Sequence, residues 1–274
     1  MQTLKVIDSN YLRDPGLFEF LCNRENVVVL CDYVGLEVFK AGDPVRLITE
    51  TMRPLASRAD QVFVLQRTVA IQRTVGAGRG FSRDMIDFET TAGFPLFYQK
   101  VVSCVSGDNV ETELGQKQKE AVTLAEDAKA TADAMVRVFP TFFDRLPAKD
   151  VALMRQGKGL SLTIKTALRK QAIAMTAEIH RERNISQRRI EASDLMHSIT
   201  FRFALSILIL MLRWLRRGTA PTNMENIRNH AFDCGVAAYA TYFNGLLTRD
   251  KEAQTTFTEI TQLLDEWYGV PPNA

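Results

Sequence analysis

Residues 229–251, NHAFDCGVAAYATYFNGLLTRDK, change from one pattern of hydrophobicity to another within a short span. Small side chains follow Asp233 at helical spacing, and a short apolar run at 243–247 then stops at Thr248. The stretch therefore predicts a helix, a tight turn and a buried strand. We expect Asp233 in the first turns of this helix and Asp250 just past the carboxyl end of the strand, where open α/β sheets bind their ligands.

The first predicted strand, at 4–7, also ends at an acid, because it leads directly into Asp8. A helix at 15–26, a β-branched strand at 27–30 and a second helix carrying Glu37 are expected next. A hard divalent cation needs several oxygen ligands that converge from different elements. The acids near the two ends of the chain are therefore candidates to meet around one metal ion.

Two further apolar patterns extend this N-terminal unit. Residues 45–57 have apolar side chains at helical spacing, and QVFVL at 61–65 is typical of a third buried strand. Strands and helices that alternate with short connections predict an α/β fold, with a parallel sheet and helices on both faces.

The middle of the chain is predicted to be mainly helical. GAGRG at 76–80 lacks the lysine of a phosphate-binding loop and fits no dinucleotide fingerprint, so we expect a connector there. The run at 96–106 is compatible with a strand or with a buried helix. Further helices are expected at 111–138, 148–156, 161–183 and 192–217. The first of these is expected to break at Pro140.

Three segments resemble the PIN domain, a metal-dependent nuclease family: VIDSN at 6–10, LCDYVGLEVF at 30–39 and FDCGVAAYATYFNGLLTRDK at 232–251. The resemblance implies a PIN-like parallel sheet flanked by helices and built from residues 1–70 and 221–270. It does not cover residues 71–220. These would form a mainly helical insertion that interrupts the core and is basic in 155–217.

The resemblance also implies which residues form the site. The acids expected to be catalytic and to ligate the metal are Asp8, Glu37, Asp233 and Asp250. Asp8 and Asp250 would bind the metal directly. Asp233 would bind it directly or through water, and Glu37 would hold a metal-bound water. The polar residues expected to support these acids are Asn10 and Thr248. Carboxylates suit Mg²⁺ or Mn²⁺, because both are hard cations that prefer oxygen.

Each acid also has a simpler interpretation. Asp8 is compatible with a turn or a helix cap, and Asp233 with a cap of its own helix. Glu37 is compatible with a solvated helix surface. Asp32, just upstream, is either the cap of that helix or a rival candidate for the site. Asp250 is compatible with the start of the last helix.

Charge is distributed unevenly along the chain. Residues 155–217 hold thirteen Lys and Arg against four acids, a net charge of +9. Because the whole chain carries +2, the remainder sums to −7. This asymmetry indicates a polyanionic partner. The expected nucleic-acid contacts are Arg188, Arg189, Arg216, Arg217 and Arg249. Alternatively, these side chains only keep a helical surface soluble.

Composition gives little support to several other classes of protein. The four cysteines are scattered without a CxxC pair, and the three histidines are not spaced as zinc ligands. The apolar run at 203–212 has ten uncharged residues, too few to cross a bilayer, so we expect a buried helix and no membrane partner. Reduced thiols and the absence of a recognisable leader sequence lead us to expect a cytoplasmic location.

The resemblance to the PIN domain, together with the basic segment, implies a divalent-metal-dependent endoribonuclease that hydrolyses phosphodiester bonds, of the kind that the family contributes to toxins and defence systems. A structure-specific DNA nuclease is the first alternative, with DNA in place of RNA as the partner. A non-catalytic RNA-binding or interaction module on a PIN-like scaffold is the second. The apolar face at 205–212 is also compatible with a homodimer partner or an inhibitory protein.

Overall fold

A parallel sheet organises one half of the molecule. The computed structural model describes residues 2–39, 43–73, 83–103, 108–185, 195–218 and 223–268. Within these residues, four strands form one sheet in the order β3-β2-β1-β4. The strands are β1 (Thr3–Ile7), β2 (Asn26–Leu30), β3 (Val62–Val64) and β4 (Leu246–Leu247). The predicted mixed α/β class with a parallel sheet is confirmed, and most of the remaining structure is helical.

The order of the strands places a switch point beside β1. The chain adds β2 and β3 on one side of β1 and returns much later to add β4 on the other. Val6 accordingly pairs in parallel with Val29 of β2 and with Leu246 of β4. In open α/β sheets, ligands bind beyond the carboxyl ends of the strands at such a point. Here that place is the end of β1 and β4.

Six helices of the described N-terminal residues surround the sheet, and their caps explain several boundaries. They are α1 (Pro15–Cys22), α2 (Asp32–Phe39), α3 (Pro44–Thr51), α4 (Arg53–Ala56), α5 (Thr68–Arg73) and α6 (Phe88–Val102). The side chain of Asp14 caps α1, that of Asp43 caps α3 and that of Asp87 caps α6.

Some of the predicted boundaries in this half were wrong. The helix expected at 45–57 is two helices, because Pro54 has no N–H to donate to the preceding turn and α4 starts anew beside it. The helix expected at 15–26 ends at Cys22. The run at 96–106 proves to be helical in its described part, where it forms the end of α6.

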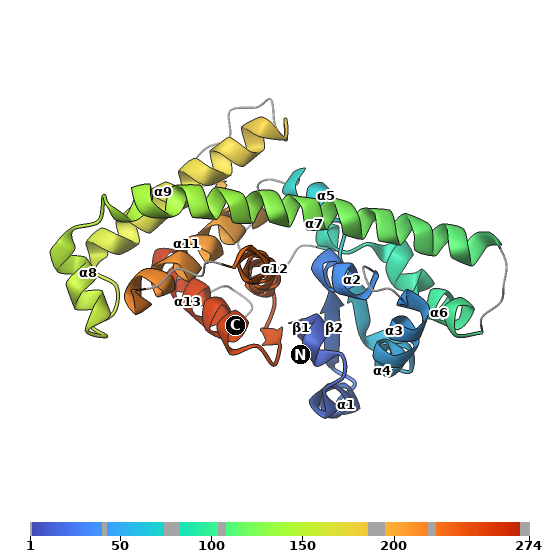
Figure 1. The fold of residues 1–274 in the computed structure, drawn as a ribbon. Coiled ribbons are helices and arrows are strands. Elements are labelled where there is room, and N and C mark those ends of the chain that lie inside the picture. The colour runs from blue at the N-terminus through green and yellow to red at the C-terminus, as the bar shows by residue number, and fades with distance from the viewer. Residues whose placement is uncertain are drawn as a thin grey trace.

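A single long helix, α7 (Asp108–Phe143), joins the two halves of the molecule (Figure 1). In Figure 1 it crosses above the sheet and continues over the helices that lie beyond it. The break predicted at Pro140 was wrong, since α7 continues to Phe143. Proline removes one backbone hydrogen bond from a helix. The rings of Phe139 and Phe143, with centroids 4.8 Å apart, and the burial of Phe142 hold the last turn in place.

The second half is a helical bundle with its own hydrophobic core. Its elements are α8 (Ala148–Arg155), α9 (Leu162–Glu182), α11 (Ile199–Arg217), α12 (Met224–Ala240) and α13 (Lys251–Tyr268). The helix expected at 192–217 begins only at Ile199 in the described residues, because the hydroxyl of Ser198 caps it by accepting from the N–H of Phe201 at 3.1 Å.

The apolar helix α11 is buried in this bundle, as its sequence predicted. Throughout the described ranges, no helix has both the length and the hydropathy needed to cross a bilayer.

The C-terminal α-β unit was predicted correctly in order, with two corrections. The helix α12 begins at Met224, capped by Asn223, so Asp233 lies in its middle and not in its first turns. The residues before Gly245 form a turn, so that β4 has only two residues instead of the five predicted at 243–247. Gly245 has φ = 147°, a backbone conformation that favours glycine.

Candidate functional site

Three of the predicted site residues meet where β1 and β4 end. The hydroxyl of Thr248 donates to Asp8 Oδ2 at 2.7 Å, and Asn10 Nδ2 donates to the same oxygen. The other end of the Asn10 amide accepts from the backbone N–H of Arg249 at 2.9 Å. Asp8 is therefore held by residues from both strand ends, 240 positions apart in the chain, as the predicted supporting roles of Asn10 and Thr248 require.

The other three acids each have partners of their own, of which the sequence indicated only the helix that follows Asp250. Ser9 Oγ donates to Glu37 Oε2, which ties α2 to the end of β1. Asp233 Oδ2 lies 3.7 Å from Nδ1 of His230, one turn earlier on α12. Asp250 Oδ1 accepts from the N–H groups of the first turn of α13, at 2.6 and 3.0 Å. Asp250 therefore caps the start of the last helix, which is the simpler interpretation given for it in the sequence analysis.

The pKa values show that the four acids act on one another. Burial raises the pKa of Asp8 to about 6, against the hydrogen bond from Thr248, and the negative charges of Asp233 and Glu37 raise it further. Burial also raises the pKa of Asp233, against the partnership with His230, with added repulsion from Asp250 and Glu37. The four carboxylates thus share one electrostatic environment, which we call the acidic rim.

The donor chemistry of the acidic rim fits a hard divalent cation. All four side chains offer carboxylate oxygens, which hard divalent cations prefer as ligands. Ionised carboxylates that lie near one another repel each other, and a bound cation offsets this repulsion. The rim is not assembled as a finished metal cage, however. Among the described residues, no group of three or more His, Cys, Asp or Glu side chains has a geometry ready to hold an ion. Three of the carboxylates instead have neighbours of their own: Ser9 for Glu37, His230 for Asp233 and the first turn of α13 for Asp250.

A close contact joins α2 and α12, the helices that carry Glu37 and Asp233. A Cβ atom added to Gly235 of α12 would lie 2.5 Å from two ring atoms of Tyr33 of α2. The Tyr33 ring in turn packs against Phe232 and Tyr239, with centroids 6.1 and 6.2 Å away. Only glycine allows this approach, which sets how α2, carrying Glu37, lies against α12.

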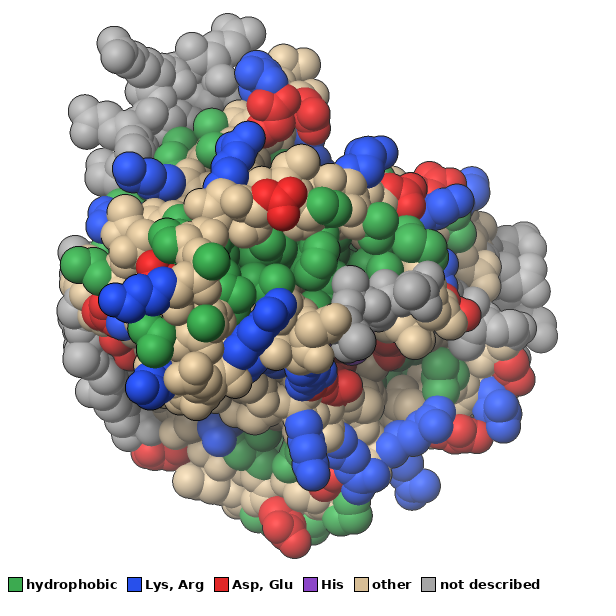
Figure 2. All heavy atoms as spheres, turned by 60° about the vertical axis from the view of Figure 1, so that its left-hand side comes forward, with side chains coloured by type: hydrophobic (Ala, Val, Ile, Leu, Met, Phe, Trp, Pro, Cys, Tyr) green, Lys and Arg blue, Asp and Glu red, His purple; other side chains and the backbone are tan. Residues whose placement is uncertain are grey.

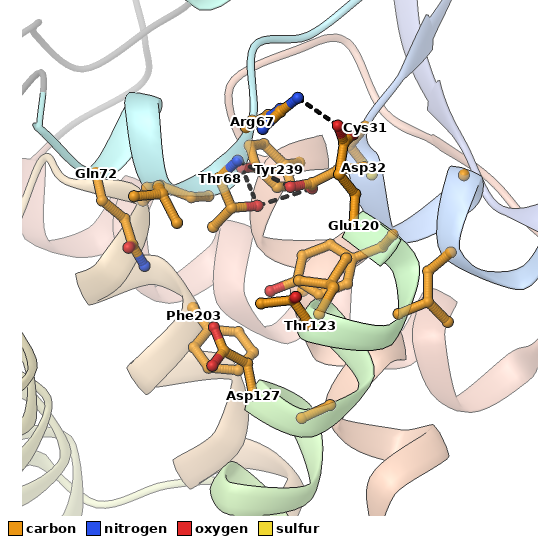
Figure 3. A pocket seen from close by; sticks show the side chains of 18 of the residues that line it. Cys31, Asp32, Arg67, Thr68, Gln72, Glu120, Thr123, Asp127, Phe203 and Tyr239 are labelled. Carbon is orange, nitrogen blue, oxygen red and sulfur yellow. Dashed lines mark hydrogen bonds and ion pairs between the residues drawn. The ribbon is translucent and has the colours of Figure 1, made fainter. Parts of the chain in front are cut away.

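Asp32, the rival candidate, does not belong to the acidic rim. It lies at the start of α2, and its carboxylate accepts from the N–H and the hydroxyl of Thr68 at 2.8 and 2.7 Å. These bonds direct Asp32 toward a separate cavity (Figure 3). The four rim acids are all described residues, and none of them lines this cavity.

The basic residues of 155–217 are engaged to a large extent inside the chain. Five of the thirteen form ion pairs with acids in the described residues: Lys165, Arg181, Arg183, Arg213 and Arg217. Three of these pairs use one stripe of α13, where Glu252, Glu259 and Glu266 recur every seven residues. Figure 2 shows Lys and Arg side chains with Asp and Glu side chains among them, and hydrophobic side chains gathered in a hollow near the centre.

The residues predicted to contact nucleic acid have different positions. Arg217 pairs with Glu252, and Arg249 pairs with Asp14, the cap of α1. Arg216 lies near Glu259, where its charge opposes the rise of the Glu259 pKa caused by burial. Arg188 and Arg189 lie outside the described residues.

Comparison of the chain with protein-family models, with curated proteins and with solved structures found no match.

Proposed function

We propose that the chain is a divalent-metal-dependent endoribonuclease built on a PIN-like core, with the acidic rim as its active site. One observation carries the proposal: Asp8 is buried at the switch point of a parallel sheet, where the carboxylates of Asp233 and Glu37 act on it electrostatically and Asp250 acts in turn on Asp233. Such a concentration of like charge opposes folding, and a hard cation that binds there offsets it.

Asp8, Asp233 and Asp250 are the residues that would hold Mg²⁺ or Mn²⁺, with Glu37 beside them. A bound divalent cation lowers the pKa of a coordinated water and neutralises the leaving oxygen of a phosphodiester. The chain's own contribution is positioning. Asn10 and Thr248 orient the Asp8 carboxylate, and Ser9 orients Glu37.

Arg249 stands beside this rim, since its N–H binds Asn10 and its guanidinium binds Asp14. An arginine in this position is suited to contact a substrate phosphate by exchanging the carboxylate of Asp14 for the phosphate oxygens.

A second candidate function is a binding module that does not cleave. The observation that favours it is the partnership of three rim acids with Ser9, His230 and the N-terminus of α13, which leaves the rim without a preformed metal cage in the described residues.

The test is cleavage of labelled single-stranded RNA, structured RNA and single-stranded DNA by the purified chain, with Mn²⁺, Mg²⁺ or EDTA. We expect metal-dependent cleavage of RNA that is abolished in Asp8→Asn and Asp250→Asn. Asp43→Asn is the matched control for Asp250→Asn, because both residues cap a helix and asparagine retains that function.

The outcomes separate the candidates. Cleavage of DNA alone identifies the DNA nuclease. RNA binding without cleavage by the wild type supports the binding module, and unchanged cleavage by Asp8→Asn shows that the active site lies elsewhere.

A further inference from the structure

A large, partly open cavity of about 1330 Å³ lies between α2, α5, α6, α7, α9, α11 and α12. One long wall of the cavity is α7, which lines it from Glu113 to Val138. At a rise of 1.5 Å per residue this distance is about 37 Å. A cavity of this size exceeds those that hold ordinary small-molecule ligands, which measure roughly 300–1,000 Å³. It can accommodate an elongated molecule.

The walls of the cavity are mostly apolar. Aromatic rings and thioethers supply much of the lining, as in Phe94, Phe97, Phe203, Met135, Met175 and Met211. Methionine side chains are flexible and adapt to ligands of irregular shape. The walls therefore suit a flexible apolar chain.

Asp32 places one half-buried carboxylate at this apolar space. Its two oxygens accept from Thr68, and the hydroxyl of Tyr239 donates to the Thr68 hydroxyl at 2.8 Å (Figure 3). Burial raises the pKa of Asp32 against these hydrogen bonds.

No described residue forms an ion pair with Asp32. The nearby cations are already engaged, since Arg67 pairs with Glu120 and Arg183 pairs with Asp127. A carboxylate that is partly removed from water and has no counter-charge favours a cation, so a cation brought in by a ligand would be stabilised there.

The charge of the lining restricts which charge the ligand can carry. Among the described residues, eight Asp and Glu side chains and five Lys and Arg side chains line the cavity, a net charge of −3. This balance disfavours a nucleic acid or a fatty carboxylate as the occupant. Next to Asp32, the rings of Tyr33 and Tyr239 lie 6.2 Å apart and offer the kind of surface that attracts a cation.

We propose that this cavity binds an elongated apolar molecule carrying a protonated amine, with Asp32 as the counter-ion of the amine and the apolar walls enclosing the rest. The site is distinct from the acidic rim, so it does not depend on the proposed nuclease activity. The helices α2 and α12 contribute residues to both sites.

The experiment compares three ligands with the same ten-carbon chain, decylamine, decanol and decanoate, each below its critical micelle concentration. Isothermal titration calorimetry with the full chain gives the affinities, and thermal unfolding gives an independent measure of binding. We expect saturable binding of the amine, about tenfold tighter than that of the alcohol, which is the ratio one charge-assisted hydrogen bond supports. The carboxylate should bind more weakly than both.

Asp32→Asn should lower the affinity for decylamine to that for decanol and leave decanol binding unchanged, which also shows that the cavity is intact. Asp87→Asn is the matched control. Asp87 also lines the cavity and accepts from the N–H and hydroxyl of one threonine, Thr90, at 2.8 Å each, but it caps α6. This variant should retain the preference for the amine.

Two results would overturn the proposal. If the wild type binds the amine and the alcohol with equal affinity, Asp32 is not the counter-ion of the amine. This result needs only the wild-type protein, so it holds even if Asp32→Asn fails to fold. The absence of saturable binding by all three ligands means that the cavity is not a site for this class of molecule.

Discussion

Replacing Asp8 by asparagine should make the protein more stable at neutral pH while destroying the proposed activity. Only 7% of the Asp8 surface is exposed, and its pKa rises from an ordinary value of 3.8 to about 6 in the folded chain. The folded state therefore binds a proton more tightly than the unfolded state. Protonated Asp8 therefore stabilises the fold relative to the ionised form. This stabilisation is fully present below about pH 4 and is lost as the pH rises through 6.

The size of this loss follows from the shift. Each unit of pKa corresponds to 1.36 kcal/mol, so a rise of about two units costs the ionised form about 3 kcal/mol. Asparagine resembles the protonated acid, and its oxygen can still accept from Thr248 and Asn10. Asp8→Asn should therefore gain up to about 3 kcal/mol at pH 8 and almost nothing at pH 4.

The assay is thermal unfolding in EDTA at pH 4, 6 and 8. A gain of this size raises Tm by roughly 6 °C or more in a chain of this length. Adding Mn²⁺ should stabilise the wild type, by about 2.7 kcal/mol at a hundredfold excess over Kd, and should stabilise Asp8→Asn much less.

Asp14→Asn is a control whose expected effect on stability at pH 8 is opposite to that of Asp8→Asn. Its hydrogen bond with Arg249, and then that with the N–H of Gly16, lower the pKa of Asp14, so its ionised form stabilises the fold. The variant should be less stable than the wild type at pH 8, and the difference should shrink toward low pH. The reasoning about the acidic rim is refuted if Asp8→Asn is no more stable at pH 8, or if its effect is the same at pH 4.

Two further predictions concern packing and buried charge. Gly235→Ala should destabilise the protein, because the added Cβ would meet Tyr33 at 2.5 Å and such overpacking costs about 1–3 kcal/mol. Gly115→Ala in α7, where nothing lies within 4 Å of the added Cβ, should stabilise the protein by about 1 kcal/mol. Urea unfolding of the two variants measures both changes in the free energy of unfolding. Arg213→Met should cost about 3 kcal/mol, because it leaves Glu252 and Glu259 without their buried partner. Adding Glu259→Gln should recover part of that loss in the same urea assay, and full additivity of the two changes would contradict it.

The sequence was most informative where local pattern decides structure. The strands that end at Asp8 and before Asp250 are short apolar runs that lead to an acid, and both were predicted, although β4 is shorter than expected. The position of Asp233 within α12 was missed, because the helix starts at Asn223, whose capping signal lies outside the pattern of small residues used to find the helix.

The partners of the site residues could not be predicted in the same way, because they depend on the tertiary fold. Ser9 holds Glu37 across 28 positions, and Arg249 reaches Asp14 across 235. The excess of positive charge in 155–217 was counted correctly, but a count does not show where opposite charges lie. The spacing of seven between Glu252, Glu259 and Glu266 is the signal that would have indicated an acidic stripe facing those bases.

The pairing of β1 with β4 has a consequence for how the protein is made. These strands lie about 240 residues apart, and Leu4 and Asn244 exchange hydrogen bonds across that distance. At roughly 5–20 residues per second, the ribosome needs about 12–48 s to proceed from one strand to the other. Throughout that interval a nascent chain exposes the open edge of β1, which is a template for pairing with other chains. The acidic rim forms only after Asp250 has been synthesised, so translation itself delays the assembly of the proposed active site.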